Sequence, residues 1–187
     1  MTHPPIKYLQ GEKVYLRPLE PHDVDKMYVS INNDLEMRRL TGTQRSFTRQ
    51  QIEDYMAGLA GDSSRAQFAI CVQGTDELIG DIALNNMYIR ANRDANLRIA
   101  IFSEENCGKG YGSEAIRLLL DFGFGILNLH RIELEVYTIN PRAYRAYEKV
   151  GFVQEGIKRK NYYYDHQYYD SIVMSILEDE YRELYKK

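Results

Sequence analysis

Gly108-Lys109-Gly110-Tyr111-Gly112-Ser113 joins an apolar, strand-like run at 97–102 to a long helical pattern that begins near Tyr111. Glycines allow a backbone turn to close around an anion, and the free N–H groups at a helix start point toward it. Lys109 adds a positive charge within the turn. The stretch therefore predicts a strand, a phosphate-binding turn and a helix, in that order.

The residues that follow complete a crossover. Residues 131–137, Arg-Ile-Glu-Leu-Glu-Val-Tyr, alternate strictly, as a half-buried strand does. Two strands joined by a helix in this way lie parallel in one sheet. Asn140-Pro141 then predicts a capped helix that ends at Gly151. Two more strands, at 152–160 and 168–177, and a short charged helix complete the chain.

Upstream of the turn, the pattern predicts a strand, two helices and three strands. The first strand is expected at 14–19, and the first helix begins at Pro21, because proline suits a first helical turn. Residues 48–51 are typical of a capping box. Turn-rich segments at 74–76 and 90–94 separate strands expected at 67–72, 77–87 and 96–102. The predicted fold class is α+β: a mixed, mostly antiparallel twisted sheet flanked by helices, with one central parallel strand–helix–strand crossover.

Composition excludes several classes of protein. The 187 residues are 44% hydrophobic and 27% charged, which fits one domain spanning 1–187. A net charge of −3 argues against a nucleic-acid partner. Cys71 and Cys107 predict no disulfide framework, and the four histidines show no metal-ligand spacing. The longest apolar stretch, 118–129, is too short for a membrane span, so we expect a cytoplasmic protein with no membrane partner.

Other phosphate-binding motifs fit the glycine stretch less well. Gly110-x-Gly112-x-x-Ala115 formally matches a dinucleotide fingerprint, and Glu135 lies about where that motif needs a ribose-binding acid. A dinucleotide oxidoreductase needs several crossovers, however, and the sequence predicts one. A Walker P-loop is excluded, because no Gly-Lys-Ser/Thr follows the required spacer.

Residues 107–112, Cys-Gly-Lys-Gly-Tyr-Gly, resemble the pyrophosphate loop of the GNAT N-acetyltransferases, which usually reads Arg/Gln-x-x-Gly-x-Gly/Ala. The resemblance runs from residues 14–19 through Asn140, Tyr147 and 151–156 to Asp170, and it is nearest to ribosomal-protein N-terminal acetyltransferases and spermidine acetyltransferases. It implies a GNAT fold and acetyl-CoA as cosubstrate, with no metal. The implied partner is an amine-bearing small molecule or a protein N-terminus.

The resemblance also implies roles for individual residues. Strand backbone would hold the pantetheine arm and the glycine turn would hold the pyrophosphate. The residues concerned are Ala100, Ile101 and Phe102 for the arm, and Cys107, Gly108, Lys109, Gly110, Tyr111, Gly112 and Ser113 for the pyrophosphate. Asn140 would contact the arm, and backbone N–H groups near Ile101 and Phe102 would stabilise the oxyanion. Tyr147, two helical turns beyond Asn140, would protonate the departing CoA sulfur.

Two positions depart from the family pattern. Cys107 replaces the usual Arg or Gln, which removes a long polar contact, and the adjacent helix start predicts a slightly activated thiol. Asn96 lies where relatives often carry glutamate, so Asp34, Glu36 and Asp81 are the candidates for the base. These departures leave a non-catalytic acyl-CoA-binding module as an alternative.

The acceptor is predicted from the cost of making its amine neutral. At pH 7, deprotonating an α-amine with a pKa near 8 costs about 1.4 kcal/mol, whereas an alkylamine near 10.4 costs about 4.6 kcal/mol. With no carboxylate at position 96, a peptide N-terminal α-amine is favoured over spermidine, another polyamine or a small-molecule amine. Tyrosines at 162–164 and 168–169 predict a tyrosine-rich hairpin that lines an acceptor groove or a subunit contact. We favour the contact, which would make the protein a homo-oligomer.

Overall fold

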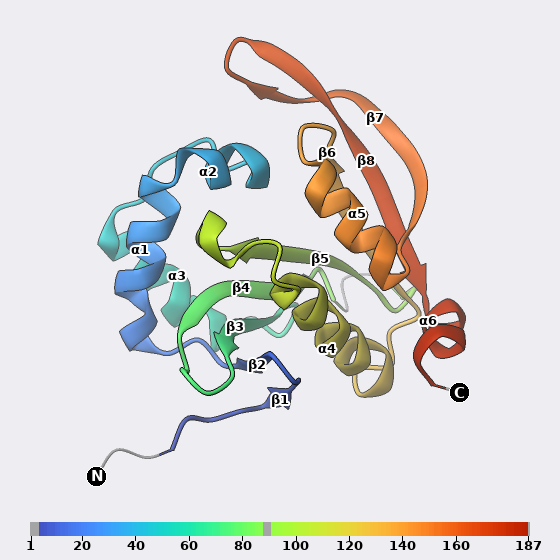
Figure 1. The fold of residues 1–187 in the computed structure, drawn as a ribbon, viewed down its shortest axis with the longest axis horizontal. Coiled ribbons are helices and arrows are strands. Elements are labelled where there is room, and N and C mark those ends of the chain that lie inside the picture. The colour runs from blue at the N-terminus through green and yellow to red at the C-terminus, as the bar shows by residue number, and fades with distance from the viewer. Residues whose placement is uncertain (1–3, 88–90, 187) are drawn as a thin grey trace.

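A computed structural model describes residues 4–87 and 91–186, and within them eight strands form one twisted sheet (Figure 1). The spatial order of the strands is β1-β2-β3-β4-β5-β6-β8-β7. Their bounds are β1 (Leu9–Gln10), β2 (Val14–Arg17), β3 (Ala66–Val72), β4 (Leu78–Asn85), β5 (Asp94–Ile101), β6 (Arg131–Tyr137), β7 (Val153–Tyr164) and β8 (Gln167–Leu177). The predicted turn at 90–94 includes residue 90, which lies outside the described residues.

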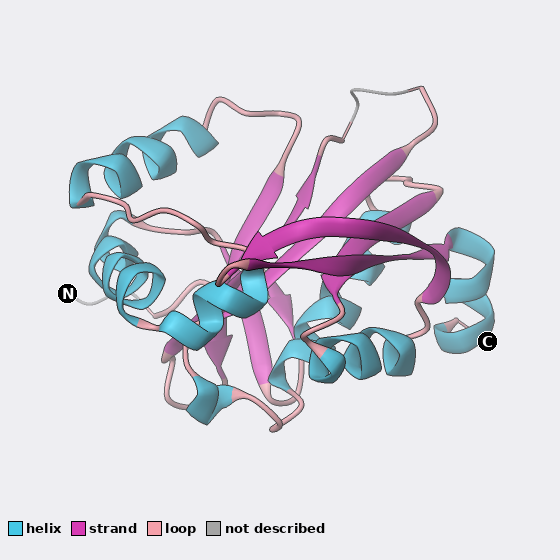
Figure 2. Ribbon diagram, turned by 90° about the horizontal axis from the view of Figure 1, so that it is seen from above, coloured by secondary structure: helices cyan, strands magenta, loops and turns pink. Residues whose placement is uncertain are grey.

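Helices cover both faces of this sheet (Figure 2). They are α1 (Val24–Asn33), α2 (Leu35–Thr41), α3 (Arg49–Leu59), α4 (Tyr111–Gly125), α5 (Pro141–Val150) and α6 (Glu178–Tyr185). Helices α1 and α3 pack on one face, with Val24, Met27 and Ile52 buried. Helices α4, α5 and α6 pack against the main core. No helix in the part of the chain that the structure describes is long and apolar enough to cross a membrane.

The predicted α+β class is confirmed by the strand pairing. Among the pairs between described strands, β5 and β6 run parallel, and the others run antiparallel. Helix α4 connects the parallel pair, as the crossover prediction requires. The predicted capping box at Thr48 and the Asn140 cap are also present.

Three features differ from the prediction. The two-residue strand β1 gave too short a pattern to recognise. Asp34 divides the first predicted helix, because its side chain caps a new helix by accepting from the Met37 N–H. Strand β7 continues beyond its predicted end at residue 160 and includes the tyrosines at 162–164, because cross-strand pairing continues to Tyr164↔Gln167.

The parallel pairing is short, and this positions the site. It covers Asp94↔Arg131, Ala95↔Ile132 and Asn96↔Glu133, although β5 continues to Ile101 and β6 to Tyr137. Strand β4 remains paired with β5 as far as Gly80↔Ile101. The second half of β5 therefore has a hydrogen-bonded neighbour on one side and an opening toward β6 on the other.

A buried carboxylate fixes the start of α4. Glu114 is 8% exposed and accepts hydrogen bonds from the backbone N–H groups of Glu12, Lys13 and Val14 at 3.1, 2.8 and 2.8 Å. Its charge also lies in the first turn of the helix, where an acidic group is favourable. The glycine turn before α4 is thus held against β2.

The close contact between β4 and β5 predicts a stability effect at Gly80. A Cβ at this position would lie 2.3 Å from the Ala100 carbonyl oxygen, so one strand must shift. We expect Gly80→Ala to lower the free energy of unfolding by about 1–3 kcal/mol in urea denaturation. Gly156→Ala is the control, since a Cβ there meets no atom within 4 Å. Equal effects of the two substitutions would contradict this packing.

Candidate active site

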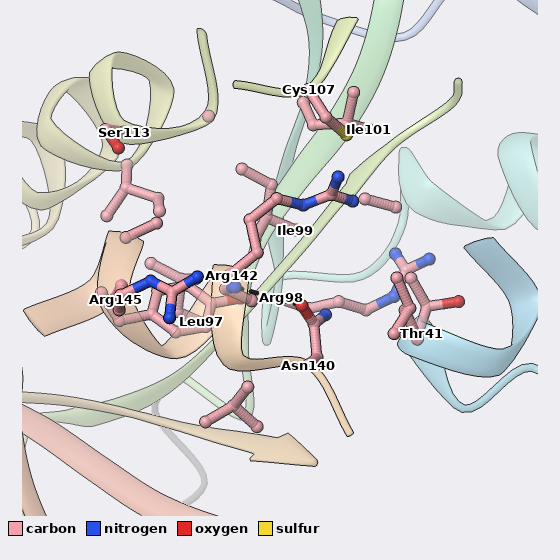
Figure 3. Close-up of a pocket in the computed structure, with 18 of the residues that line it drawn as sticks. Thr41, Leu97, Arg98, Ile99, Ile101, Cys107, Ser113, Asn140, Arg142 and Arg145 are labelled. Atoms are coloured by element: carbon pink, nitrogen blue, oxygen red, sulfur yellow. Dashed lines mark hydrogen bonds between the residues drawn. The ribbon is translucent and has the colours of Figure 1, made fainter. Parts of the chain in front are cut away.

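A cavity of about 690 Å³ occupies the opening between β5 and β6 (Figure 3). It extends from the glycine turn and α5 on one face of the sheet to α2 on the other. The backbone of the turn and three cations line the first half, which we call the cofactor half. The second half, which we call the acceptor half, is lined by Met37, Leu40, Thr41, Asn96, Arg98, Glu135 and Tyr137.

The glycine turn adopts the conformation that its sequence predicts. Gly108 and Gly110 have φ values of +75° and +85°, a region that favours glycine. Gly110 is the N-cap residue of α4, and Gly110, Gly112 and Ser113 line the cavity. The free N–H groups of this helix start therefore suit a pyrophosphate.

Two residues predicted in the loop lie away from the cavity wall. Lys109 Nζ lies 5.9 Å from the centre of the Tyr111 ring, and neither residue is among the cavity-lining residues. Lys13 Nζ, from the turn before β2, donates to the Lys109 carbonyl at 3.1 Å. The loop thus carries a second nearby ammonium that sequence reasoning missed.

Helix α5 supplies the cations of the cofactor half. Arg142, Arg145 and Lys149 recur at helical spacing and line the cavity. Figure 3 shows Arg142 extending toward Cys107. We expect Arg142 to supply the long polar contact that Cys107 lacks. Sequence reasoning missed these three residues, although their i, i+3, i+7 spacing was a usable signal.

The expectation of an activated Cys107 is wrong. Its Sγ lies 3.6 Å from the Ser103 carbonyl, and burial raises the pKa of the thiol despite the opposing charge of Arg142. The side chain therefore stays a thiol at neutral pH.

The N–H and C=O groups of successive residues in β5 point to opposite edges of the strand. The three residues predicted to hold the pantetheine arm therefore do not all face the cavity. The Phe102 N–H donates to the Ile79 carbonyl at 2.8 Å, and the Ala100 carbonyl faces Gly80 on β4. Both backbones are therefore directed away from the opening. Ile101 is the predicted residue whose backbone faces the cavity, and Ile99, which sequence reasoning missed, has the same orientation. We expect these two to hold the arm and the oxyanion, in place of Ala100 and Phe102.

Asn140 and Tyr147 share the wall formed by α5. The Asn140 Oδ1 accepts from the Ala143 N–H at 3.1 Å, which leaves its amide nitrogen for a ligand. Tyr147 packs edge-on against Phe152 with ring centres 6.0 Å apart. Burial raises the pKa of Tyr147 to about 12, so its hydroxyl keeps its proton at neutral pH. Both predicted residues therefore line the cavity in forms that suit their predicted roles.

None of the three carboxylates considered as the base lines this cavity. Asp34 caps α2, and Glu36 forms two hydrogen bonds with Arg39 that lower its pKa. Asp81 is 1% exposed and lines a smaller adjoining cavity of about 30 Å³. Each of these three carboxylates instead accepts hydrogen bonds from other parts of the protein.

Glu135 is the carboxylate among the described residues that line the main cavity. Its Oε2 accepts from Asn161 Nδ2 and Ser171 Oγ at 3.2 and 3.0 Å, and its Oε1 contacts Lys158 Nζ. These contacts from β7 and β8 hold the carboxylate at the wall. Sequence alternation placed it on one face of β6 but did not show that β5 turns away from it.

The tyrosine hairpin packs next to the acceptor half. Tyr162 stacks on Tyr137 with ring centres 4.0 Å apart, and its hydroxyl donates to the Arg39 carbonyl at 2.9 Å. Gln44 Nε2 donates to the Tyr163 carbonyl at 2.6 Å. The hairpin therefore lies against α2 and the segment after it, and Tyr162 supports Tyr137, which lines the acceptor half.

A family model described as an acetyltransferase (GNAT) domain matches residues 13–153, which is more than half of the chain. The chain belongs to the GNAT acetyltransferases. It is an acetyl-CoA-dependent N-acetyltransferase of amines, so the dinucleotide and non-catalytic interpretations are set aside. The cavity fits this cosubstrate, because it joins an anion-binding turn and cations to a narrow opening beside free strand backbone.

Similar proteins cover nearly the whole chain. Probable N-acetyltransferase YjcK of Bacillus subtilis is 34% identical, with 90% of this chain and 96% of that protein covered. Spermidine N(1)-acetyltransferase of Vibrio cholerae is 31% identical, with 91% and 96% covered. A solved structure of the Vibrio cholerae spermidine N-acetyltransferase with CoA and spermine has a TM-score of 0.83 at 30% identity, with 90% of this chain and 98% of that chain covered. The predicted GNAT fold is confirmed.

No group of three or more His, Cys, Asp or Glu side chains among residues 4–87 and 91–186 could hold a metal ion. The charged groups of the cavity are instead distributed singly along its walls.

The turn geometry predicts a binding effect at Gly110. A side chain at a φ of +85° is strained by about 1–2 kcal/mol, and relief of this strain would displace the N–H groups. We expect Gly110→Ala to raise the calorimetric Kd for acetyl-CoA about tenfold. Gly125→Ala, at the far end of α4 where a Cβ meets no atom within 4 Å, is the control. Unchanged binding by Gly110→Ala would contradict a pyrophosphate site in this turn.

Proposed function

We propose that the acceptor is a polyamine and that one of its terminal amines is acetylated at Glu135. The observation that carries this proposal is the acidic face of the sheet beside the cavity. Glu135 lines the cavity. Glu133 comes two residues earlier on the same face of β6, and the backbones of these two residues are about 6.6 Å apart. Glu155 of β7 adjoins them, since it accepts from Ser175, the cross-strand neighbour of Glu133.

This row of carboxylates suits a chain of ammonium groups. Arg131 bonds to both Glu133 and Glu155, and Lys158 pairs with Glu135. The protein thus already places cations along this face, and exposed ion pairs of this kind are weak enough for a ligand to replace. The named spermidine acetyltransferases among the relatives support the same acceptor class.

The peptide α-amine favoured by the sequence has less support. That expectation rested on the absence of a base, and Glu135 now supplies a carboxylate within the cavity. The higher cost of deprotonating an alkylamine therefore no longer argues against a polyamine.

The proposed mechanism uses Glu135 on the β6 wall of the cavity and Tyr147 on the α5 wall. The bound ammonium gives one proton to Glu135, directly or through water, and the neutral amine then attacks the thioester carbonyl, so that the C–N bond forms. Backbone N–H groups of Ile99 or Ile101 stabilise the oxyanion. The C–S bond then breaks, Tyr147 gives its proton to the sulfur, and the second proton of the amine nitrogen returns to Tyr147 through water. Burial raises the pKa of Tyr147, and burial of the CoA sulfur in the same cavity would also raise the pKa of the thiol, so the transfer is not made more costly by burial alone.

The homo-oligomer, the single domain and the cytoplasmic location stay predictions. Tyr163 and Tyr168 of the hairpin are 47% and 62% exposed, which leaves aromatic surface for a subunit contact. A solved structure of the Vibrio cholerae relative is dodecameric. We infer that this chain also self-associates through the hairpin.

An acceptor panel tests the proposed function. We expect purified protein with acetyl-CoA to acetylate spermidine and spermine with a higher kcat/KM than peptides with free α-amines, measured by CoA release and mass spectrometry. A preference for peptides would contradict the polyamine proposal. No acetylation of any amine would contradict the assigned active site.

Paired substitutions test the proton transfers. Glu135→Gln should lower kcat at pH 7 about 100-fold and recover as the pH approaches the pKa of the amine, because a neutral acceptor needs no base. Tyr147→Phe should lower kcat about 100-fold or more, with an unchanged Kd for acetyl-CoA. Glu133→Gln is the matched control, since it should raise the KM for spermidine and leave kcat unchanged. Normal turnover by Glu135→Gln would remove the role of this carboxylate.

A further inference from the structure

The acceptor half of the cavity holds a charged pair that the proposed mechanism does not use. The Asp81 side chain on β4 is 2% exposed, whereas the Arg98 side chain on β5 is 48% exposed. Arg98 Nη1 donates to Asp81 Oδ2 at 2.9 Å, and Gln67 Nε2 donates to the same oxygen at 2.8 Å. The carboxylate is thus held within the structure, and the guanidinium lies on the cavity wall.

The pair presents its positive end to the acceptor. Arg98 lines the main cavity, whereas Asp81 lines the smaller adjoining one. Figure 3 shows Arg98 extending toward Thr41 of α2. Among the described residues, Asp81 is its hydrogen-bonding partner, so the remaining N–H groups of the guanidinium are available to the cavity. A buried carboxylate behind an accessible guanidinium leaves a net positive potential in front of it.

Asp81 also keeps Arg98 apart from Glu135. Arg98 forms its ion pair with Asp81, and Glu135 forms its own with Lys158. Of the two pairs, the guanidinium of Arg98 on β5 and the carboxylate of Glu135 on β6 are the members that line the main cavity. A proton that leaves an amine between them moves away from the guanidinium and toward the carboxylate.

Other polar groups face Arg98 from the neighbouring elements. Arg38 of α2 lines the smaller cavity with it, which adds to the positive charge on that side. Tyr55 of α3 interacts electrostatically with Arg98, and Tyr137 lies on the same wall as Glu135. Glu133 belongs to the last residue pair before the two strands separate. None of these groups places a second carboxylate in front of the guanidinium among the residues that the structure describes.

We propose that Arg98, held by Asp81, lowers the pKa of the bound acceptor ammonium and so drives its proton to Glu135. This inference rests on the proposed function, because it requires an alkylamine acceptor. A fixed charge a few ångströms away shifts the pKa of an ammonium by about 1–3 units. The same charge weakens binding of the protonated acceptor, so the site gives up affinity for reactivity.

The pH dependence of kcat at saturating spermidine tests the role, because kcat reports ionisation in the enzyme–substrate complex. Arg98→Gln should move the acidic limb to higher pH by about 1–3 units and lower kcat at pH 7 about tenfold or more, without raising the KM for spermidine. Arg98→Lys keeps the charge and should keep the limb near its original position. The double variant Asp81→Asn/Arg98→Gln leaves no unpaired buried carboxylate, so it should shift the limb in the same direction as Arg98→Gln but by a smaller amount.

Two controls make the result specific. Arg49→Gln removes a surface guanidinium paired with Asp25 and should leave the limb in place. Calorimetric binding of acetyl-CoA should be the same for all Arg98 variants. An unmoved limb, or a higher KM with unchanged kcat, would overturn the inference, and the latter would show that Arg98 contributes to binding of the acceptor and not to its ionisation. Failure of the unsubstituted protein to acetylate any amine would instead contradict the proposed function.

Discussion

The structure depends on the early end of the parallel pairing between β5 and β6. Three residue pairs join the strands, and beyond Asn96↔Glu133 they separate. A sheet normally satisfies its backbone groups by pairing, so unpaired N–H and C=O groups inside a protein call for another partner. The pantetheine arm, which carries amide groups of its own, suits the backbone of Ile99 and Ile101. The opening also connects the two faces of the sheet, and this lets cosubstrate and acceptor meet from opposite sides.

The two faces have opposite chemical tasks. The glycine turn, the start of α4 and the cations of α5 suit an anionic cosubstrate, and Glu114 fixes that turn through three backbone hydrogen bonds. The acceptor face has to make an amine neutral, which for an alkylamine costs about 4.6 kcal/mol at pH 7. Glu135 and Arg98 on opposing walls divide this task, since one receives the proton and the other disfavours the ammonium. Tyr147, with a pKa raised to about 12, keeps its proton at neutral pH, as the proposed transfer to the sulfur requires.

Local sequence predicted the parts of the site that local physics determines. The alternation at 131–137 predicted both ends of β6 correctly. The glycines at 108 and 110 occupy the left-handed conformations that their turn requires. Asn140 caps α5 as its position before proline suggests. The direction of each backbone group in β5 could not be predicted, because it depends on which residues pair with β4. The contacts of Tyr162 with α2 and of Tyr163 with the segment after it span 123 and 119 residues, and no local pattern reports them. The sequence suggested Glu135 only as the ribose-binding acid of a dinucleotide motif. Its place in the cavity could not be predicted, because it follows from the separation of β5 from β6.

The most direct test of this account is a crystal structure of the protein with CoA and spermidine. The account predicts that the pantetheine amides bond to the backbone of Ile99 and Ile101 in the opening, with a terminal nitrogen of spermidine between Glu135 and Arg98. A pantetheine arm bound to Ala100 or outside the opening would contradict the central role of the separated strands. So would an acceptor nitrogen bound on the α5 side, away from both charged walls.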